Sequence, residues 1–100
     1  MIWLEIIELR SAVSNPESVK KELTNLIDDL NRNNNQTIAK LYIHVHIRTD
    51  FSIHLIHETE LDESTGSEVG LNISSNLKAF GLVNHNIWFE TNTNISRRKK

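Results

Sequence analysis

The chain contains no cysteine, only one proline and only three glycines among its 100 residues. The absence of cysteine excludes disulfides, thiolate metal sites and cysteine nucleophiles, and it fits a reducing compartment. No apolar run approaches the roughly 18 residues that span a bilayer. The apolar start is interrupted by Glu5 and Glu8 and lacks a basic stretch and a small-residue cleavage site. We therefore interpret this start as a strand and expect a cytoplasmic protein with no membrane partner.

The chain also lacks a strong charge of either sign. Its 11 lysines and arginines oppose 13 acidic residues, and the formal net charge is -2. This balance gives no electrostatic reason to expect nucleic acid as a partner. Four basic residues, Arg97 to Lys100, end a stretch with almost no apolar content. We predict one α+β domain over residues 1–91 and a disordered basic tail over residues 92–100.

The clearest pattern lies between Lys40 and Glu58. Apolar and polar residues alternate there with a period of two, on both sides of Arg48–Asp50, which predicts two strands joined by a three-residue turn. This register places His44 across from His54, with His46 on the same face. The predicted apolar pairs are Ile47 with Phe51, Val45 with Ile53 and Ile43 with Leu55.

Strands and helices are also predicted on either side of this hairpin. Residues 2–9 alternate as a first strand. Asn15 and Pro16 are typical of a helix start, and apolar residues at helical spacing follow as far as Leu30. This helix should end near Asn31. Residues 65–68, Thr-Gly-Ser-Glu, match a capping box with the threonine as N-cap. Gly81 is predicted to end this second helix before a last strand over residues 82–90.

This order of elements predicts a ferredoxin-like βαββαβ fold, with a four-stranded antiparallel sheet and two helices on one face. The other sheet face is then left open. We expect the helices to cover Leu4, Ile6, Ile43, Val45, Ile53, Leu55, Ile87 and Phe89. The open face then carries Trp3, Glu5, Tyr42, His44, His46, His54, Ile56 and Trp88. An apolar open face of this kind usually meets a partner or a ligand.

In its element order and apolar open face, the segment from Ile2 to Glu90 resembles one subunit of the dimeric α+β barrels. In that superfamily two ferredoxin-like subunits pack their open sheet faces together, so the resemblance implies a homodimer. Its members include small monooxygenases without metal or flavin, ligand-binding modules, stress-responsive proteins and many uncharacterised chains. The resemblance is at fold level, and no functional residue is carried over from it.

The open face is the candidate site, and its residues leave several functions open. We predict a small-ligand site at Tyr42, His44, His46, His54 and Trp88. A cofactor-independent monooxygenase-like enzyme and a protein-interaction module are alternatives, and no catalytic motif decides whether the chain is an enzyme. We expect no cofactor; the alternative is a divalent transition metal held by His44, His46 and His54, with Glu5 as an extra ligand.

Two further histidines fall in the core-facing phase, near strand ends. His57 and His85 are interpreted as hydrogen-bonded or partly exposed side chains rather than as catalytic groups. Gly66 and Gly70 could admit an anion to the start of the second helix. Because the lysine and hydroxyl residue of a P-loop are missing, we interpret both glycines as capping and close-packing residues.

Overall fold

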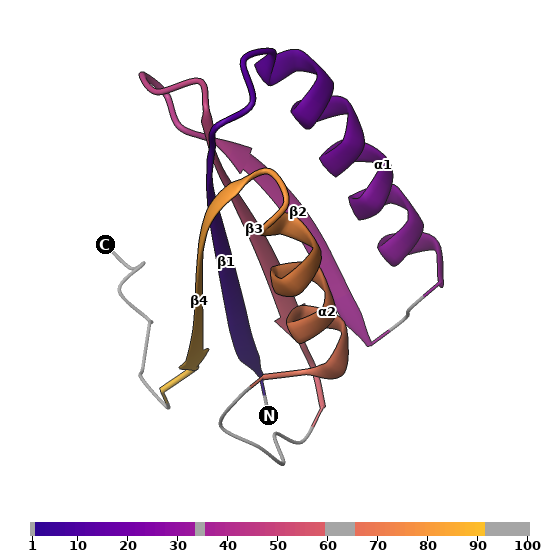
Figure 1. Cartoon of the computed structure of the whole chain (residues 1–100). Helices are drawn as coiled ribbons and strands as arrows, with labels where there is room; N and C mark the ends of the chain where they lie inside the picture. The colour runs from indigo at the N-terminus through magenta and orange to yellow at the C-terminus, as the bar shows by residue number, and fades with distance from the viewer. Residues whose placement is uncertain (1, 34–35, 60–65, 92–100) are drawn as a thin grey trace, which may run out of the picture.

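The computed structural model describes residues 2–33, 36–59 and 66–91. The predicted ferredoxin-like order is confirmed (Figure 1). The elements are β1 (Trp3–Ser11), α1 (Pro16–Asn33), β2 (Thr37–Ile43), β3 (Asp50–His57), α2 (Glu68–Leu77) and β4 (Gly81–Phe89). All paired strands are antiparallel, in the order β2-β3-β1-β4. The predicted tail, residues 92–100, lies outside the described residues.

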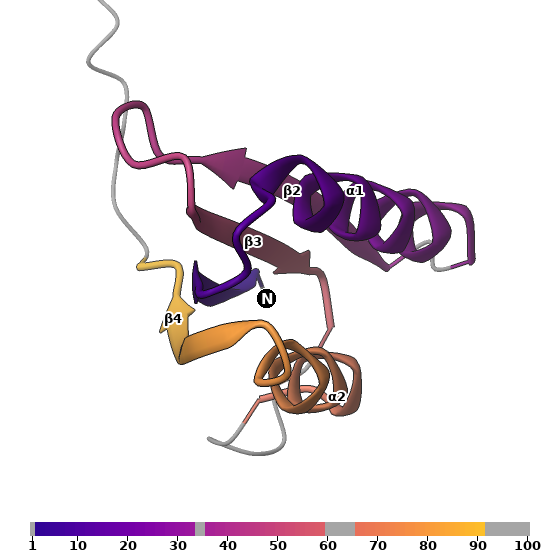
Figure 2. The same cartoon turned by 45° about the horizontal axis from the view of Figure 1, so that its top comes forward.

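Both helices lie on the same face of the sheet (Figure 2). α1 packs on β2, while α2 packs on β4 and β1. The core fills the space between the two layers. Its buried apolar residues are Ile7, Leu9, Val19, Leu23, Ile27, Ala39, Phe51, Ile53, Leu55, Ile73 and Leu77. No helix of the described residues is long and apolar enough to cross a membrane.

α1 begins where the sequence predicts. Asn15 Oδ1 accepts a hydrogen bond from the backbone amide of Glu17 at 3.1 Å, as an N-terminal cap does. The helix ends at Asn33, two residues beyond the predicted end. The side chain of Asn31 accepts a hydrogen bond from the Ala39 amide at 2.8 Å and donates one to the Ala39 carbonyl at 2.9 Å. This pair of bonds ties the last turn of α1 to β2.

α2 begins two residues later than the capping-box pattern indicates. The N-cap is Ser67, whose Oγ accepts a hydrogen bond from the Gly70 amide at 2.9 Å, while Thr65 lies outside the described residues. The C-cap is Lys78, so Gly81 is not the helix stop that was predicted. Gly81 instead opens β4, where a Cβ atom would lie 2.1 Å from the Arg10 carbonyl oxygen. Close backbone approach explains this glycine.

The predicted face of β1 was wrong. Trp3, Glu5, Ile7 and Leu9 are buried beneath the helices, whereas Leu4 and Ile6 lie on the open face. β1 is apolar in both phases near its start, so its first residues do not decide the orientation. The opposite orientation would bury Glu8 and Arg10 together. The observed orientation buries a single charged residue, Glu5, and the structure supplies it with hydrogen-bond partners.

The predicted register of the β2–β3 hairpin was also wrong, but its apolar residues within the strands lie on the predicted face of the sheet. Ile43 pairs with Phe51, and the connection is a six-residue turn over residues 44–49 rather than a three-residue one. An even shift keeps each side chain on its own face. The longer turn leaves Val45 84% exposed. In exchange, β2 pairs back to Thr37, which lies opposite His57 at the far end of the hairpin.

Candidate functional site

The open face of the sheet carries a continuous apolar row. Ile38, Ile56, Leu4 and Trp88 are paired side by side, so this row crosses all four strands. Its outer members are exposed, Ile38 at 51% and Trp88 at 55%. Tyr42 and Leu82 add exposed apolar surface nearer the β2–β3 turn. The prediction of an apolar open face therefore survives, with Leu4 and Ile6 in place of Trp3 and Glu5.

Two hollows on the surface of the described residues are each lined by some of the residues predicted for the ligand site. One, of about 590 Å³, lies at the turn end of the sheet and is lined by Tyr42 and His44. The other, of about 250 Å³, lies at the end that carries the apolar row and is lined by His54 and Trp88. His46 lines neither hollow. The five residues predicted for one site thus lie in two places.

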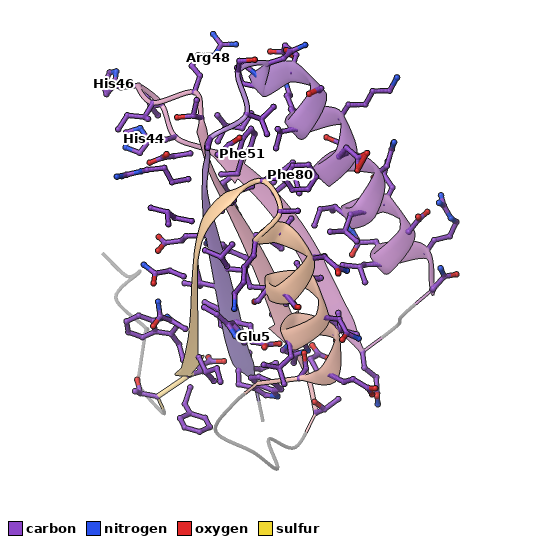
Figure 3. All side chains as sticks on the ribbon, in the orientation of Figure 1. Glu5, His44, His46, Arg48, Phe51 and Phe80 are labelled. Carbon is purple, nitrogen blue, oxygen red and sulfur yellow. The ribbon has the colours of Figure 1, made fainter. Side chains whose placement is uncertain are left out.

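The three histidines of the metal alternative are not brought together. His44 and His46 lie in the turn, where Figure 3 shows them projecting from the end of the hairpin. His54 lies on β3 opposite Lys40, not opposite His44. The Nδ1 atom of His44 accepts hydrogen bonds from the amides of His46 and Ile47 at 3.0 and 3.1 Å. Among residues 2–33, 36–59 and 66–91, no group of three histidine or acidic side chains is placed to hold a metal ion.

His54 is the one predicted histidine that faces outward from the sheet itself. Its Nε2 atom lies 3.1 Å from Ser52 Oγ, and its ring centre lies 4.5 Å from that of Tyr42. Desolvation lowers the pKa of His54, and the charge of Lys40 lowers it further against the opposing effect of Glu8. His54 is therefore held in its neutral form more strongly than an exposed histidine.

A second polar cluster lies on the other face, buried between the sheet and α2. Its centre is Glu5, which is 0% exposed and lies near the opposite end of the sheet from the turn histidines (Figure 3). Its Oε1 atom lies 2.7 Å from His57 Nε2, and its Oε2 atom lies 2.7 Å from His85 Nε2. Ser67 donates to the same carboxylate from its hydroxyl and, at 3.0 Å, from its backbone amide. We call Glu5, His57, His85 and Ser67 the buried carboxylate cluster.

The strands place the two imidazoles on either side of Glu5. His57, on β3, pairs with Trp3 of β1, and His85, on β4, pairs with Ile7 of β1. Because Trp3 and Ile7 lie two residues before and after Glu5, both histidines are diagonal neighbours of Glu5. Trp3 stacks on the His57 ring with centres 4.1 Å apart. Both imidazoles are hydrogen-bonded, as predicted. His57 lies at the end of β3 as expected, but the predicted place of His85 near a strand end was wrong, because it lies in the middle of β4.

The glycines that precede and follow Ser67 leave room for the cluster. A Cβ atom on Gly70 would lie 2.1 Å from Glu5 Oε2. One on Gly66 would lie 2.4 Å from the same oxygen and 2.8 Å from His85 Cε1, and Gly66 has a φ of 110° that favours glycine in any case. The interpretation of both glycines as close-packing residues is therefore correct. The anion at the start of α2 is the chain's own Glu5 carboxylate.

Hydrogen bonding keeps Glu5 ionised in spite of its burial. Burial alone raises the pKa of Glu5, but hydrogen bonds from His57, Ser67 and His85 outweigh it, so the pKa lies below the ordinary value. The start of α2 adds its positive dipole end on the same side. A carboxylate with four donors uses its full accepting capacity.

Sequence reasoning missed this cluster because it assigned Glu5 to the open face. A signal was nevertheless present. His57 and His85 both fall in the core-facing phase of strands, and two buried imidazoles need polar partners. Glu5 is the only acidic residue of β1 in the phase of Trp3, Ile7 and Leu9. Two glycines just before and after a helix N-cap also indicate close approach to a neighbouring group.

The element order and the antiparallel sheet are those of a ferredoxin-like α+β fold. No protein-family model and no curated protein matches the chain. A solved structure titled "Structure of Rv0793 from Mycobacterium tuberculosis" is similar, with a TM-score of 0.65 and 14% sequence identity. The match covers 93% of this chain and 98% of that chain. At this identity the likeness shows the fold alone.

Proposed function

We propose that the chain acts as a homodimer whose two open sheet faces pack together and enclose a site for a small organic molecule. The observation that carries this proposal is the apolar row from Ile38 to Trp88, which crosses the whole sheet and is covered by neither α1 nor α2. Exposed apolar surface of this extent is typical of an interaction face.

The size of the open face supports a second copy of the chain as its occupant. Strands about 4.8 Å apart and about eight residues long make a face of roughly 500 Å² in flat projection. Accessible area exceeds flat projection because side chains stand out from the sheet. Two such faces therefore reach the roughly 1,200 Å² at which stable interfaces begin. A self-complementary two-fold contact needs only this one surface.

The charged residues of the face are compatible with such a contact. Lys40 and Glu8 lie on the same face as the apolar row, and Arg10 pairs with Asp50 at 3.2 Å next to the turn. Both signs are thus present on one surface, so two copies can oppose unlike charges. The apolar row lies at one end of the sheet and the Arg10–Asp50 pair at the other.

The hollow at the turn end supports the ligand part of the proposal. Its volume of about 590 Å³ lies in the range of small-molecule sites, roughly 300 to 1,000 Å³. Tyr42 and Leu82 supply apolar lining, and Arg10, His44 and Asn84 supply polar groups. A partner face would close the open side of this hollow. No feature of the described residues favours oxygenation of such a ligand over simple binding, so binding is the function proposed.

The dimer is tested by placing a charge in the apolar row. Trp88→Glu should shift the protein from dimer to monomer in sedimentation velocity at tens of micromolar, because an unpaired carboxylate in a desolvated contact costs several kcal/mol. Leu71→Glu is the matched control, since Leu71 is also an exposed apolar residue but lies on α2, on the other side of the sheet. A monomeric unmodified protein, or equal dissociation of both variants, contradicts the proposal.

Ligand binding is tested separately on the purified protein. Native mass spectrometry of the unmodified chain should show a bound small molecule that is lost in Tyr42→Ala, because Tyr42 is an exposed aromatic side chain that lines the hollow. Lys21→Ala, an exposed change on α1, should retain it. A dimer that carries no molecule would support the protein-interaction alternative instead.

A further inference from the structure

The two imidazoles of the buried carboxylate cluster differ in one respect. Each presents Nε2 to an oxygen of Glu5 at 2.7 Å. Because the ionised carboxylate only accepts hydrogen bonds, each Nε2 must carry a proton. In a neutral imidazole the proton-free atom is then Nδ1, and the two residues diverge at that atom.

The Nδ1 atom of His57 is occupied. It lies 2.8 Å from Thr37 Oγ1, and the ring is stacked on Trp3. The side chain is only 4% exposed. With both nitrogens engaged and one ring face covered, His57 has a structural role.

The Nδ1 atom of His85 has no hydrogen-bond partner within residues 2–33, 36–59 and 66–91. Its side chain is 15% exposed, and Nδ1 is not among the buried unpaired atoms of the described chain. The His85 ring is thus partly exposed and is held at Nε2 by Glu5, whereas no described residue engages its Nδ1 atom.

We propose that His85 is a proton-accepting site whose Nδ1 atom takes a proton from a neutral weak acid, with Glu5 as its positioning residue. The carboxylate fixes the tautomer and ring orientation and stabilises the imidazolium that forms. This is the part that the aspartate plays toward histidine in a serine-protease triad. The step is balanced: a donor X–H loses its proton to Nδ1, giving X⁻ and imidazolium, and no other reactant is needed.

The charges around His85 define the class of donor. Glu5 faces the ring from β1 and carries a buried negative charge, while the neighbours of His85 on the same face of β4 are uncharged Val83 and Ile87. The nearest acidic residue of α2, Glu68, is exposed in its first turn. The negative charge of Glu5 next to the ring disfavours an anionic donor. It favours a neutral O–H, N–H or activated C–H group whose proton is drawn inward.

This site lies on the helix-covered face of the sheet, whereas the proposed dimer and ligand site lie on the open face. The two proposals therefore stand or fall independently.

Chemical modification of the full chain tests the difference between the two imidazoles. Diethyl pyrocarbonate is attacked by a proton-free imidazole nitrogen, which becomes carbethoxylated while ethanol and carbon dioxide leave. Peptide mass spectrometry resolves all five histidines. His85 should react early, at a rate comparable with that of exposed His46, and His57 should react only once the fold is lost. Protection of His85 equal to that of His57 overturns the proposal.

The role of the carboxylate is tested with two variants. Glu5→Gln should slow the modification of His85 by about tenfold, which is less than the roughly 100-fold or more that positioned acid–base groups contribute in catalysis. His57→Gln is the matched control, because it removes one imidazole from Glu5 but leaves the Glu5–His85 pair, so the His85 rate should hold. An unchanged His85 rate in Glu5→Gln overturns the positioning role.

A measurement on the unmodified protein keeps the test decisive if Glu5→Gln does not fold. Imidazole nitrogen NMR should show His85 at neutral pH with its proton on Nε2 and a bare Nδ1. A proton on Nδ1 instead would overturn the proposal, because the accepting atom would then be occupied.

Discussion

Glu5 shows how one buried charge depends on its immediate partners. The carboxylate is removed from water, yet two imidazoles, a hydroxyl and a backbone amide donate to it. Removing the charge while leaving the donors should cost about 3 kcal/mol, because buried donors are left poorly paired. We therefore expect Glu5→Gln to be much more destabilising than Glu8→Gln, an exposed change on the same strand.

The lowered pKa of Glu5 also predicts how its contribution to the free energy of unfolding changes with pH. The folded pKa of Glu5 is below its ordinary value of 4.5, so the unfolded chain binds the proton more readily. The contribution of Glu5 is present above about pH 4.5 and is lost as the pH falls through the folded pKa. Urea unfolding should thus show the gap between the unmodified protein and Glu5→Gln narrowing below about pH 4. A constant gap would mean that Glu5 is not ionised.

Ser74, unlike Glu5, is a buried polar residue whose side chain lacks a hydrogen-bond partner among the described residues. Its hydroxyl is the one buried side-chain polar atom of the described residues without a hydrogen-bond partner. Ser74→Ala should therefore stabilise the fold by about 1 kcal/mol in urea unfolding. Ser75→Ala, at the next and exposed position of α2, measures the helix-propensity gain that both changes share. A smaller gain at residue 74 than at residue 75 would show that the Ser74 hydroxyl finds a partner.

The docking of α2 on the sheet depends on the small size of one of its residues. An alanine at position 70 favours the helix by about 1 kcal/mol, but its Cβ atom would lie 2.1 Å from Glu5 Oε2. We expect the clash to win and Gly70→Ala to lower stability by about 2 kcal/mol, the usual range for overpacking. Asn72→Ala, on the exposed side of the same helix, should be neutral or stabilising. Thermal unfolding of both variants makes the comparison.

The elements themselves were largely predictable from the sequence, because their periodicity is local. The Val19, Leu23 and Ile27 stripe indicates α1, and alternation indicates β3 with its correct buried face. The register of β2 was not predictable, since the choice of turn depends on hydrogen bonds at His44 and on a pairing between Thr37 and His57.

The orientation of β1 and the buried carboxylate cluster could not be predicted from the sequence, for a related reason. Either orientation of β1 buries apolar residues near its start, and the observed one is favoured by partners that lie far along the chain. Glu5 meets His57 across 52 residues and His85 across 80. A window of neighbouring residues contains neither partner, so Glu5 on its own indicates an exposed side chain.

At the scale of the whole molecule, His54 connects the proposed dimer to pH. Its pKa is already lowered in the single chain, by desolvation and Lys40, and a partner face would desolvate it further. The separated chain then binds protons more readily than the dimer. The dimer should be most stable above the pKa of His54 in the separated chain, which lies below the ordinary value of 6.5, and should weaken as the pH falls through that pKa.

Sedimentation velocity at about pH 7.5 and about pH 5.5 checks this dependence. The unmodified protein should dissociate more at the lower pH, and His54→Gln should remove most of the difference. His46→Gln, a change in the exposed turn, should leave the difference in place. Dissociation that is equally steep in His54→Gln would assign the effect to another group.

The buried carboxylate cluster also has a consequence for the order of folding events. Glu5 draws its partners from β3, β4 and the start of α2, which lie 52, 80 and 62 residues away in the chain. A collapsed intermediate that lacks β4 or α2 leaves the carboxylate dehydrated and short of donors, and so is penalised relative to the complete fold. Contacts of such long range form late, so Glu5→Gln should speed unfolding in stopped-flow measurements while changing the refolding rate little. The buried charge of Glu5 thus raises the free energy of partly folded states relative to the native state. Folding of this small sheet is therefore more nearly two-state.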